Sequence, residues 1–353
     1  MKIAPASAPI QPLRSAHSAT REFAFFVVPV VCALLVAGYV AAQWQHGFLP
    51  GADRPFPLAG VRVPNWHIFW MGLWTGYTMA LVGQAAGIFA LAYSMSILQF
   101  TSPAITPTTL VLSFLNPIGA LLGFRRTGQW NLAIAKWVCI GGLLGGMLGP
   151  FLRLTVFSEP RPFRLLVGAA LAIMGVHLLK GAFRQGRESA SAQDAAANIE
   201  TLQDTGGRLV IGCGGERWTL GKSGLFLTGA GVGAIGSALG VGGGFLLVPI
   251  LVTAYQLPMY VLVAITIPYV IVNAAVGLFT YAVMMPLVAH AYIDPEWSWG
   301  LFAAAGGVLG AWLAAKAQRS VPEHLLRLML GGVTAVAGTL YVLDFFVELP
   351  FRI

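Results

Sequence analysis

The stretch that constrains the fold most is Gly240-Val241-Gly242-Gly243-Gly244-Phe245-Leu246-Leu247-Val248-Pro249-Ile250-Leu251. It lies within 223–256, a run without charged residues. Consecutive glycines are costly in a continuous helix, and each unsatisfied backbone group costs several kcal/mol in lipid. The sequence therefore predicts a helix break, either at a substrate site or at a packing hinge. A helix beginning after such a break would direct free N–H groups at an anion.

The composition around this stretch is that of a membrane protein. Hydrophobic residues make up 57% of the 353-residue chain and charged residues only 10%, and the mean hydropathy is +0.76. A soluble domain carries about 25% charged residues, so a soluble enzyme and a disordered chain are excluded. The net charge of +8 lies in short loops between apolar runs, which indicates basic loops beside membrane spans and not nucleic-acid binding.

Long apolar runs divide the chain into five regions. We expect a cytoplasmic polar tail at 1–22, an extra N-terminal transmembrane helix at 23–43, a first transmembrane repeat at 66–183, a cytoplasmic central loop at 184–221 and a second transmembrane repeat at 222–346. The N-terminal run is too long for the apolar core of a cleaved signal peptide, so we expect a retained anchor. Within the central loop, 209–220 could form a short hairpin.

The two halves resemble each other in sequence. We match 83–87 with 236–240, Thr109 and Asn116 with Thr266 and Asn273, 141–145 with 306–310, and 168–175 with 331–338, all in the same order. Repeated halves are common in secondary transporters, and this pattern predicts a duplication.

Each half opens with an uncharged run, 66–100 or 223–256, that is too long for one span of about 20 residues and short for two. We predict that each run forms two partial helices folded as a re-entrant hairpin. This arrangement leaves few of the 21 Lys and Arg residues outside, namely Arg54, Arg62, Arg153, Arg161, Arg164 and Arg352. A single crossing would place most of them outside, against the positive-inside rule. The hairpin arrangement makes the repeats inverted and the N-terminus cytoplasmic.

Polar residues inside spans are candidate ligands by default. Thr109 and Asn116 lie seven residues apart on one helix face, as do Thr266 and Asn273, and these pairs could bind an oxyanion or join helices. Beside the breaks we add a further set of candidate substrate-binding residues, Gln84, Ser237, Gly242, Gly243 and Gly244.

Several other chemistries find no support in the sequence. All 13 carboxylates fall in tails, loops or span ends, so we expect no carboxylate relay at mid-membrane. The glycines of 231–236 fit GxGxxG, but the next acidic residue is Asp294, so close helix packing explains them better than a dinucleotide site. No HExxH occurs and the three cysteines are far apart, so no metal, cofactor or catalytic residue is expected.

The Gly240–Leu251 stretch, with the repeat and the glycine-rich segment 306–310, resembles the signature of the sulfite exporter TauE/SafE family over about residues 66–346. The resemblance implies a bacterial inner-membrane transporter for small, mostly sulfur-containing anions. The first half departs from the family pattern, because 87–94 has neither the triple glycine nor the proline.

We therefore expect an all-α, multi-pass membrane protein of two inverted repeats with broken helices. By the resemblance, it would be a secondary transporter that exports sulfite, sulfoacetate or a related organosulfonate by alternating access. An anion channel and, less favoured, an intramembrane enzyme are the alternatives. The expected partners are a small anion and the lipid bilayer, and homo-oligomers remain open.

Overall fold

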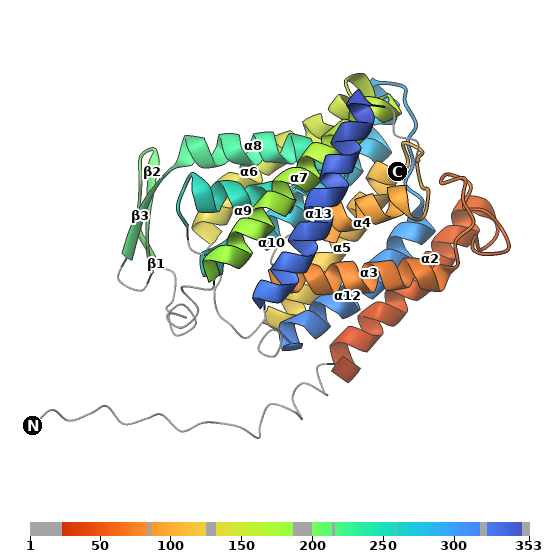
Figure 1. Cartoon of the computed structure of the whole chain (residues 1–353), viewed down its shortest axis with the longest axis horizontal. Coiled ribbons are helices and arrows are strands. Elements are labelled where there is room, and N and C mark those ends of the chain that lie inside the picture. The colour runs from red at the N-terminus through yellow and green to blue at the C-terminus, as the bar shows by residue number, and fades with distance from the viewer. Residues whose placement is uncertain are drawn as a thin grey trace, which may run out of the picture.

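The computed structural model describes residues 23–82, 86–124, 132–185, 200–213, 216–257, 259–317 and 323–347, and most of them are helical (Figure 1). The elements up to the end of the first half are η1 (Phe23–Val27), α2 (Val28–His46), α3 (Asn65–Val82), α4 (Ala86–Ser96), α5 (Ile105–Phe124), α6 (Leu132–Thr155) and α7 (Pro160–Gln185). Those of the second half are α8 (Lys222–Leu239), α9 (Gly244–Thr253), α10 (Met259–Phe279), η2 (Thr280–Met284), α11 (Met285–Val288), α12 (Trp297–Ala317) and α13 (Glu323–Phe346).

Both long uncharged runs fold as helical hairpins, as the sequence predicts. The Tyr255 hydroxyl, beyond the end of α9, lies 3.0 Å from the Thr228 hydroxyl near the start of α8. In the first half, His67 Nε2 near the start of α3 lies 2.8 Å from the Tyr93 hydroxyl near the end of α4. Each short helix thus returns beside its long partner.

The structure describes α3 up to Val82 and α8 up to Leu239. Because residues 83–85 lie outside the described part of the chain, the match of 83–87 with 236–240, and with it the pair Gln84 and Ser237, stays a prediction.

The two halves pack closely on each other, because glycines in one half lie against the backbone of helices in the other half. A Cβ on Gly306 of α12 would lie 1.9 Å from the Phe69 carbonyl oxygen of α3, and a Cβ on Gly141 of α6 would lie 2.0 Å from that of Phe226 in α8. Helix α7 packs on α13 in the same close manner, since a Cβ on Gly338 would lie 2.4 Å from the Ala172 nitrogen. Exchanging the two halves maps the α3–α12 contact onto the α8–α6 contact.

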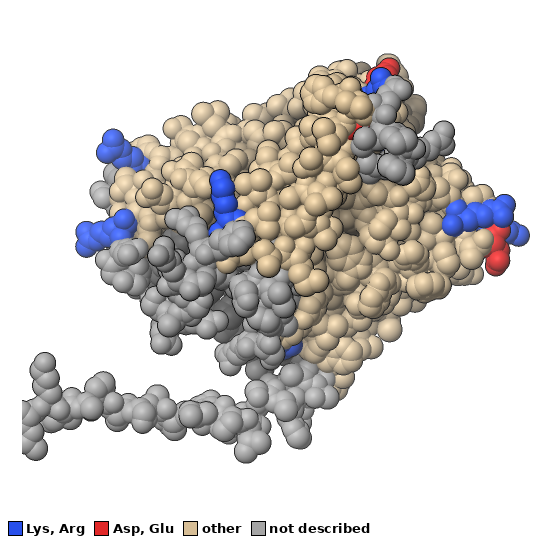
Figure 2. Space-filling view, in the orientation of Figure 1, with Lys and Arg blue, Asp and Glu red and all other residues tan. Residues whose placement is uncertain are grey.

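The described residues include six helices that are long and apolar enough to cross a membrane, at Phe23–His46, Ala133–Thr155, Pro160–Ala182, Ile265–Val288, Trp297–Ala314 and Leu328–Phe346. Figure 2 shows charged side chains gathered toward the ends of the visible face, with a wide uncharged band between them. This distribution is that of a multi-pass α-helical membrane protein.

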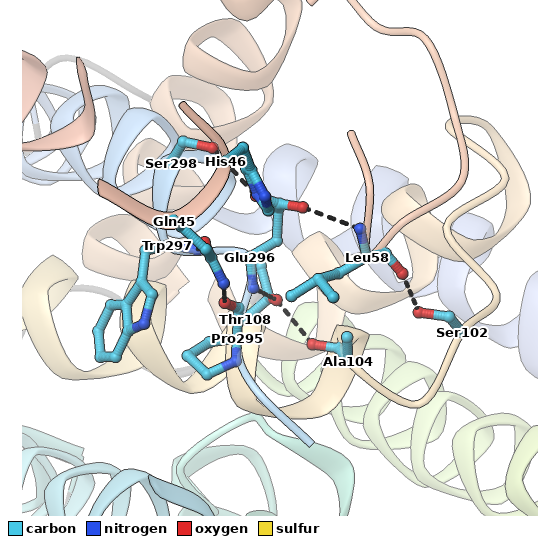
Figure 3. Close-up of polar contacts among 10 residues, drawn as sticks. All are labelled: Gln45, His46, Leu58, Ser102, Ala104, Thr108, Pro295, Glu296, Trp297 and Ser298. Atoms are coloured by element: carbon cyan, nitrogen blue, oxygen red, sulfur yellow. Dashed lines mark hydrogen bonds and ion pairs between the residues drawn. The ribbon is translucent and has the colours of Figure 1, made fainter. Parts of the chain in front are cut away.

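The extra N-terminal helix packs on the second half and extends to His46, three residues beyond the predicted end. A Cβ on Gly38 would lie 3.4 Å from the Phe302 ring of α12. At the other end of α2, His46 Nε2 lies 2.6 Å from Glu296 Oε1, and Gln45 Nε2 donates to the Pro295 carbonyl at 2.9 Å (Figure 3). These polar contacts fix α2 to the residues that precede α12.

The central segment contains more regular structure than the predicted loop. Strands β2 (Arg208–Cys213) and β3 (Glu216–Gly221) form the predicted hairpin. A strand that we did not predict, β1 (Glu200–Thr205), pairs antiparallel with β2. Leu209 and Ile211 are buried in one apolar cluster with α6, α8 and α9. The sheet lies at one end of the molecule, opposite the α2–α3 connection (Figure 1).

Candidate functional site

The second helix break needs glycine for its backbone conformation. Gly240, Gly242 and Gly243 have φ of +80°, +70° and +78°, in the left-handed region that other residues disfavour. Gly243 then precedes the first residue of α9, Gly244, and all these glycines are buried. The N–H groups of Leu246 and Leu247 donate to the Gly243 carbonyl at 3.1 Å, and those of Gly244 and Phe245 precede the first acceptor of the helix. The predicted break is confirmed, and its geometry leaves backbone donors at a buried helix start.

The first turn of α4 lies against the second break. A Cβ on Gly87, in that turn, would lie 2.9 Å from the Val241 Cα of the second break and 2.8 Å from the Ser113 hydroxyl of α5. The same hydroxyl donates to the Gly240 carbonyl at 3.4 Å. Helix α5 therefore contacts both the first turn of α4 and the second break, and the sequence analysis did not single out Ser113 for this position.

Asn116 and Asn273 are the clearest candidate ligands. Both side chains are completely buried, and neither the amide nitrogen nor the amide oxygen of either has a hydrogen-bond partner among the described residues. Asn116 lies one turn beyond Ser113 on α5, and Asn273 lies one turn beyond Val270, whose side chain faces Gly242. Buried amides normally find partners, so two unpartnered ones at matching sequence positions call for a ligand.

The predicted threonines are engaged within their own helices. The Thr109 hydroxyl donates to the Ile105 carbonyl at 3.0 Å, and the Thr266 hydroxyl donates to the Leu262 carbonyl at 2.9 Å. Thr109 nevertheless lies against the break, because a Cβ on Gly240 would be 2.4 Å from its hydroxyl. The hydroxyl oxygens of Thr109 and Thr266 can still accept a hydrogen bond, but their O–H groups already donate within the helix.

Ser237 is held by another helix, and Gln84 lies outside the described residues. The Ser237 hydroxyl donates to the Gly146 carbonyl of α6 at 3.0 Å. Pro150 leaves that carbonyl without its usual helical donor, because proline has no backbone N–H. The contact therefore joins α8 to α6 at the point where α6 lacks one backbone hydrogen bond.

Among the residues whose burial the structure describes, one carboxylate is buried, although the sequence placed all of them in tails, loops or span ends. Glu296 precedes α12 and has no exposed surface. Besides His46, its carboxylate accepts from the Leu58 backbone at 3.2 Å and from the Ser298 hydroxyl at 3.2 Å (Figure 3). It is at a span end, as expected, but its burial was not foreseen, because its partner His46 is far away in sequence.

Arg153, which the sequence analysis counts among the residues outside, is buried within a helix. Helix α6 runs to Thr155 and so includes it, and its side chain is 3% exposed. Its Nε donates to the Thr106 hydroxyl at 3.4 Å, a second nitrogen donates to the Phe157 carbonyl, and the guanidinium lies 4.0 Å from the Phe163 ring centroid. In the sequence, Arg153 lies just after an apolar run, and this position favoured placing it outside the membrane span.

Helical hairpins packed within a bundle of apolar spans define a multi-pass membrane protein. The family model described as "Sulfite exporter TauE/SafE" matches residues 13–178 and 68–341. The chain belongs to this family, as the resemblance of its glycine–proline stretch indicated, and it is a membrane transporter.

Two similar proteins come from Xylella fastidiosa. A "Probable membrane transporter protein" of strain 9a5c is 25% identical over 273 residues, which cover 76% of this chain and 90% of the relative. A protein with the same description in strain Temecula1 is 24% identical over the same shares. No solved structure gives a significant match to the chain.

Proposed function

We propose that the protein is a secondary transporter that exports a small sulfur-containing oxyanion, such as sulfite, sulfoacetate or a related organosulfonate, across the bacterial inner membrane. The observation that carries the proposal is the contact of Gly87, in the first turn of α4, with Val241 of the second break, together with the unpartnered amides of Asn116 and Asn273, which lie one helical turn along the chain from Ser113 and Val270. The sulfur chemistry of the substrate rests on the family description.

An anion suits this centre for two physical reasons. The start of α9 carries the positive end of a helix dipole together with unpaired N–H groups, and it begins inside the protein at Gly244. In the described residues, no carboxylate lies at the break to repel a negative charge; the buried one, Glu296, is tied to His46 beside α2. Asn116 and Asn273 would donate their amide N–H groups to the bound oxygens.

We further propose that the two halves are inverted repeats that move as units to give alternating access. Helix α3 follows the α2–α3 connection and α8 follows the sheet, and these two segments lie at opposite ends of the molecule (Figure 1). The exchange-related contacts of α3 with α12 and of α8 with α6 support the same relation. In this arrangement the N-terminus and the sheet are cytoplasmic.

The test is flux of radiolabelled sulfite, sulfate and sulfoacetate in proteoliposomes. We expect saturable flux of sulfite or sulfoacetate, lowered at least about 10-fold in Asn273→Ala and in Asn116→Ala. Thr339→Ala is the matched control, because this exposed hydroxyl of α13 bonds only within its own helix at 2.7 Å.

Three outcomes would revise the proposal. Flux that does not saturate with concentration would favour an anion channel. Wild-type flux in both asparagine variants would remove the central site. An absence of flux for all three anions above empty vesicles would remove the sulfur-anion assignment and leave the membrane fold standing.

A further inference from the structure

We propose that Arg153, Tyr281 and Thr106 form a second oxyanion-binding site, on the path between the central break and the end of the molecule where α6 ends. The inference rests on the proposed function, because it assigns a further step to the same anion. Its ligand is a small oxyanion with a sulfite-type or sulfonate-type head, and its residues come from α5, α6 and η2.

The first observation is a buried cation without an acidic partner. Among the described residues, ion pairs join Arg164 to Asp344 at 3.5 Å, Lys222 to Asp204 at 2.6 Å and His46 to Glu296 at 2.6 Å, but none includes Arg153. A buried charge is costly unless it is paired, and an ionisable residue inside a membrane span is a functional candidate by default.

The contacts that Arg153 does make supply only part of the missing negative charge. The Phe157 carbonyl and the Phe163 ring offer partial charges, and the carboxyl end of α6 adds its dipole. These contacts orient the guanidinium and hold it in place. A guanidinium presents five N–H donors in a planar fork that matches an oxyanion, so a bound anion would provide the full countercharge.

The second, independent observation is the hydroxyl of Tyr281. The side chain is completely buried, and its hydroxyl has no hydrogen-bond partner among the described residues. The Tyr281 side chain packs in one apolar cluster with Leu110 of α5 and with Leu154 of α6, the chain neighbour of Arg153. Tyr281 belongs to η2, a π-helical turn that continues α10, and such turns occur frequently at functional sites.

Thr106 connects this cluster with the central break. Its hydroxyl accepts from Arg153 Nε at 3.4 Å, while its carbonyl oxygen would lie 2.4 Å from a Cβ on Gly240. One residue of α5 therefore separates the guanidinium from the break. In this proposal, an anion moves from Arg153 past Thr106 to the second break and the start of α9.

The cluster lies at one end of the transporter. Thr108, two residues along α5 from Thr106, accepts from the Glu296 backbone at 2.8 Å, which places the cluster near the α2–α3 connection and away from the sheet (Figure 1). In the proposed orientation this is the external end. Arg153 would therefore receive the anion after it leaves the central site on export.

The experiment measures binding of sodium sulfite and sodium sulfoacetate to the purified full-length protein by calorimetry, at constant ionic strength. We expect Arg153→Gln to raise Kd about 10-fold or more, since a charge-assisted bond is lost. Tyr281→Phe removes only the hydroxyl and should raise Kd about 3-fold. The exposed Arg62 gives the control variant Arg62→Gln, which should bind as the wild type does.

A side-specific reading separates binding from structural support. In proteoliposomes of known orientation, Arg153→Gln should raise KM on the side where α6 ends more than on the sheet side. A folded Arg153→Gln protein with unchanged Kd and unchanged KM on both sides overturns the inference. If that variant does not fold, Tyr281→Phe decides, and an unchanged Kd in Tyr281→Phe overturns the inference.

The same data distinguish this inference from the proposed function. If Asn273→Ala loses flux while Arg153→Gln and Tyr281→Phe bind and transport normally, the second site fails and the central site stands. If the wild-type protein neither binds nor transports these anions, both fail.

Discussion

At the second break, Gly240, Gly242 and Gly243 take positive φ and Pro249 follows in α9, whereas the first break enters α4 through Ala86 and Gly87 with no proline in that helix. The second break has the backbone freedom to turn sharply and begin a new helix inside the protein. At the first break, Gly87 allows close approach to Val241. The two runs that we match in sequence therefore differ in structure: the second has the positive-φ glycines before its short helix, and the first brings Gly87 of α4 close to Val241.

The largest effect should come from Gly240→Ala. Its φ of +80° strains any other residue, and the new Cβ would lie 2.4 Å from the Thr106 carbonyl oxygen. We expect a loss of about 3 kcal/mol or more, seen as a lower thermal midpoint and lower monodisperse yield. Gly87→Ala should cost less, because the φ of Gly87 is not positive. Gly231→Ala is the control, since nothing lies within 4 Å of its Cβ position. Equal midpoints for Gly240→Ala and Gly231→Ala would show that the second break does not depend on glycine.

The next effect should come from Glu296→Gln, which tests the attachment of α2 to the second half. An amide cannot accept from His46, the Leu58 backbone and Ser298 as the carboxylate does. Leaving buried hydrogen-bond donors without their acceptor costs about 1–3 kcal/mol, and we expect a lower thermal midpoint. His46→Gln should cost less, and the double variant should cost less than the two losses added. Strict additivity would mean that His46 and Glu296 do not stabilise each other.

A smaller effect, on transport and not on stability, should separate the two asparagines. Neither side chain has a hydrogen bond to lose among the described residues, so Asn116→Ala and Asn273→Ala should shift the thermal midpoint little. Equal reductions of about 10-fold in kcat/KM would mean that the halves contribute equally. A larger loss for Asn273→Ala would extend the asymmetry of the breaks to the side chains. A large fall in stability without a change in kcat/KM would make both residues structural.

The smallest effect should come from Ser237→Ala. It removes one hydrogen bond to the Gly146 carbonyl, and such bonds between membrane helices contribute about 1 kcal/mol. We expect a slightly lower thermal midpoint and unchanged flux. Reduced flux at unchanged stability would instead make the hydroxyl a substrate ligand.

The sequence predicts features that depend on local composition. Consecutive glycines such as those of 240–244 are typical of positions where the backbone turns sharply or lies close to another segment. The helix break and its hairpin could therefore be predicted from them. The short hairpin of β2 and β3 follows in the same way. The asparagines could be named because an amide in an apolar span is costly wherever it lies.

Other features depend on contacts between residues far apart in the chain. Arg153 follows an apolar run and has the sequence pattern of a loop residue, and only the partners Thr106 and Phe163 show that it is buried. Glu296 is buried because His46 reaches it from α2.

The contact between α2 and α12 has a consequence for how the protein is made. Helix α2 leaves the ribosome long before α12, whose Phe302 and Leu301 cover Gly38. Until α12 enters the membrane, lipid alone surrounds the face of α2 that later becomes its binding surface. The contact between α2 and α12 can therefore form only after nearly the whole chain has been synthesised. A translation pause before residue 297 would leave α2 in the membrane without its contact to α12.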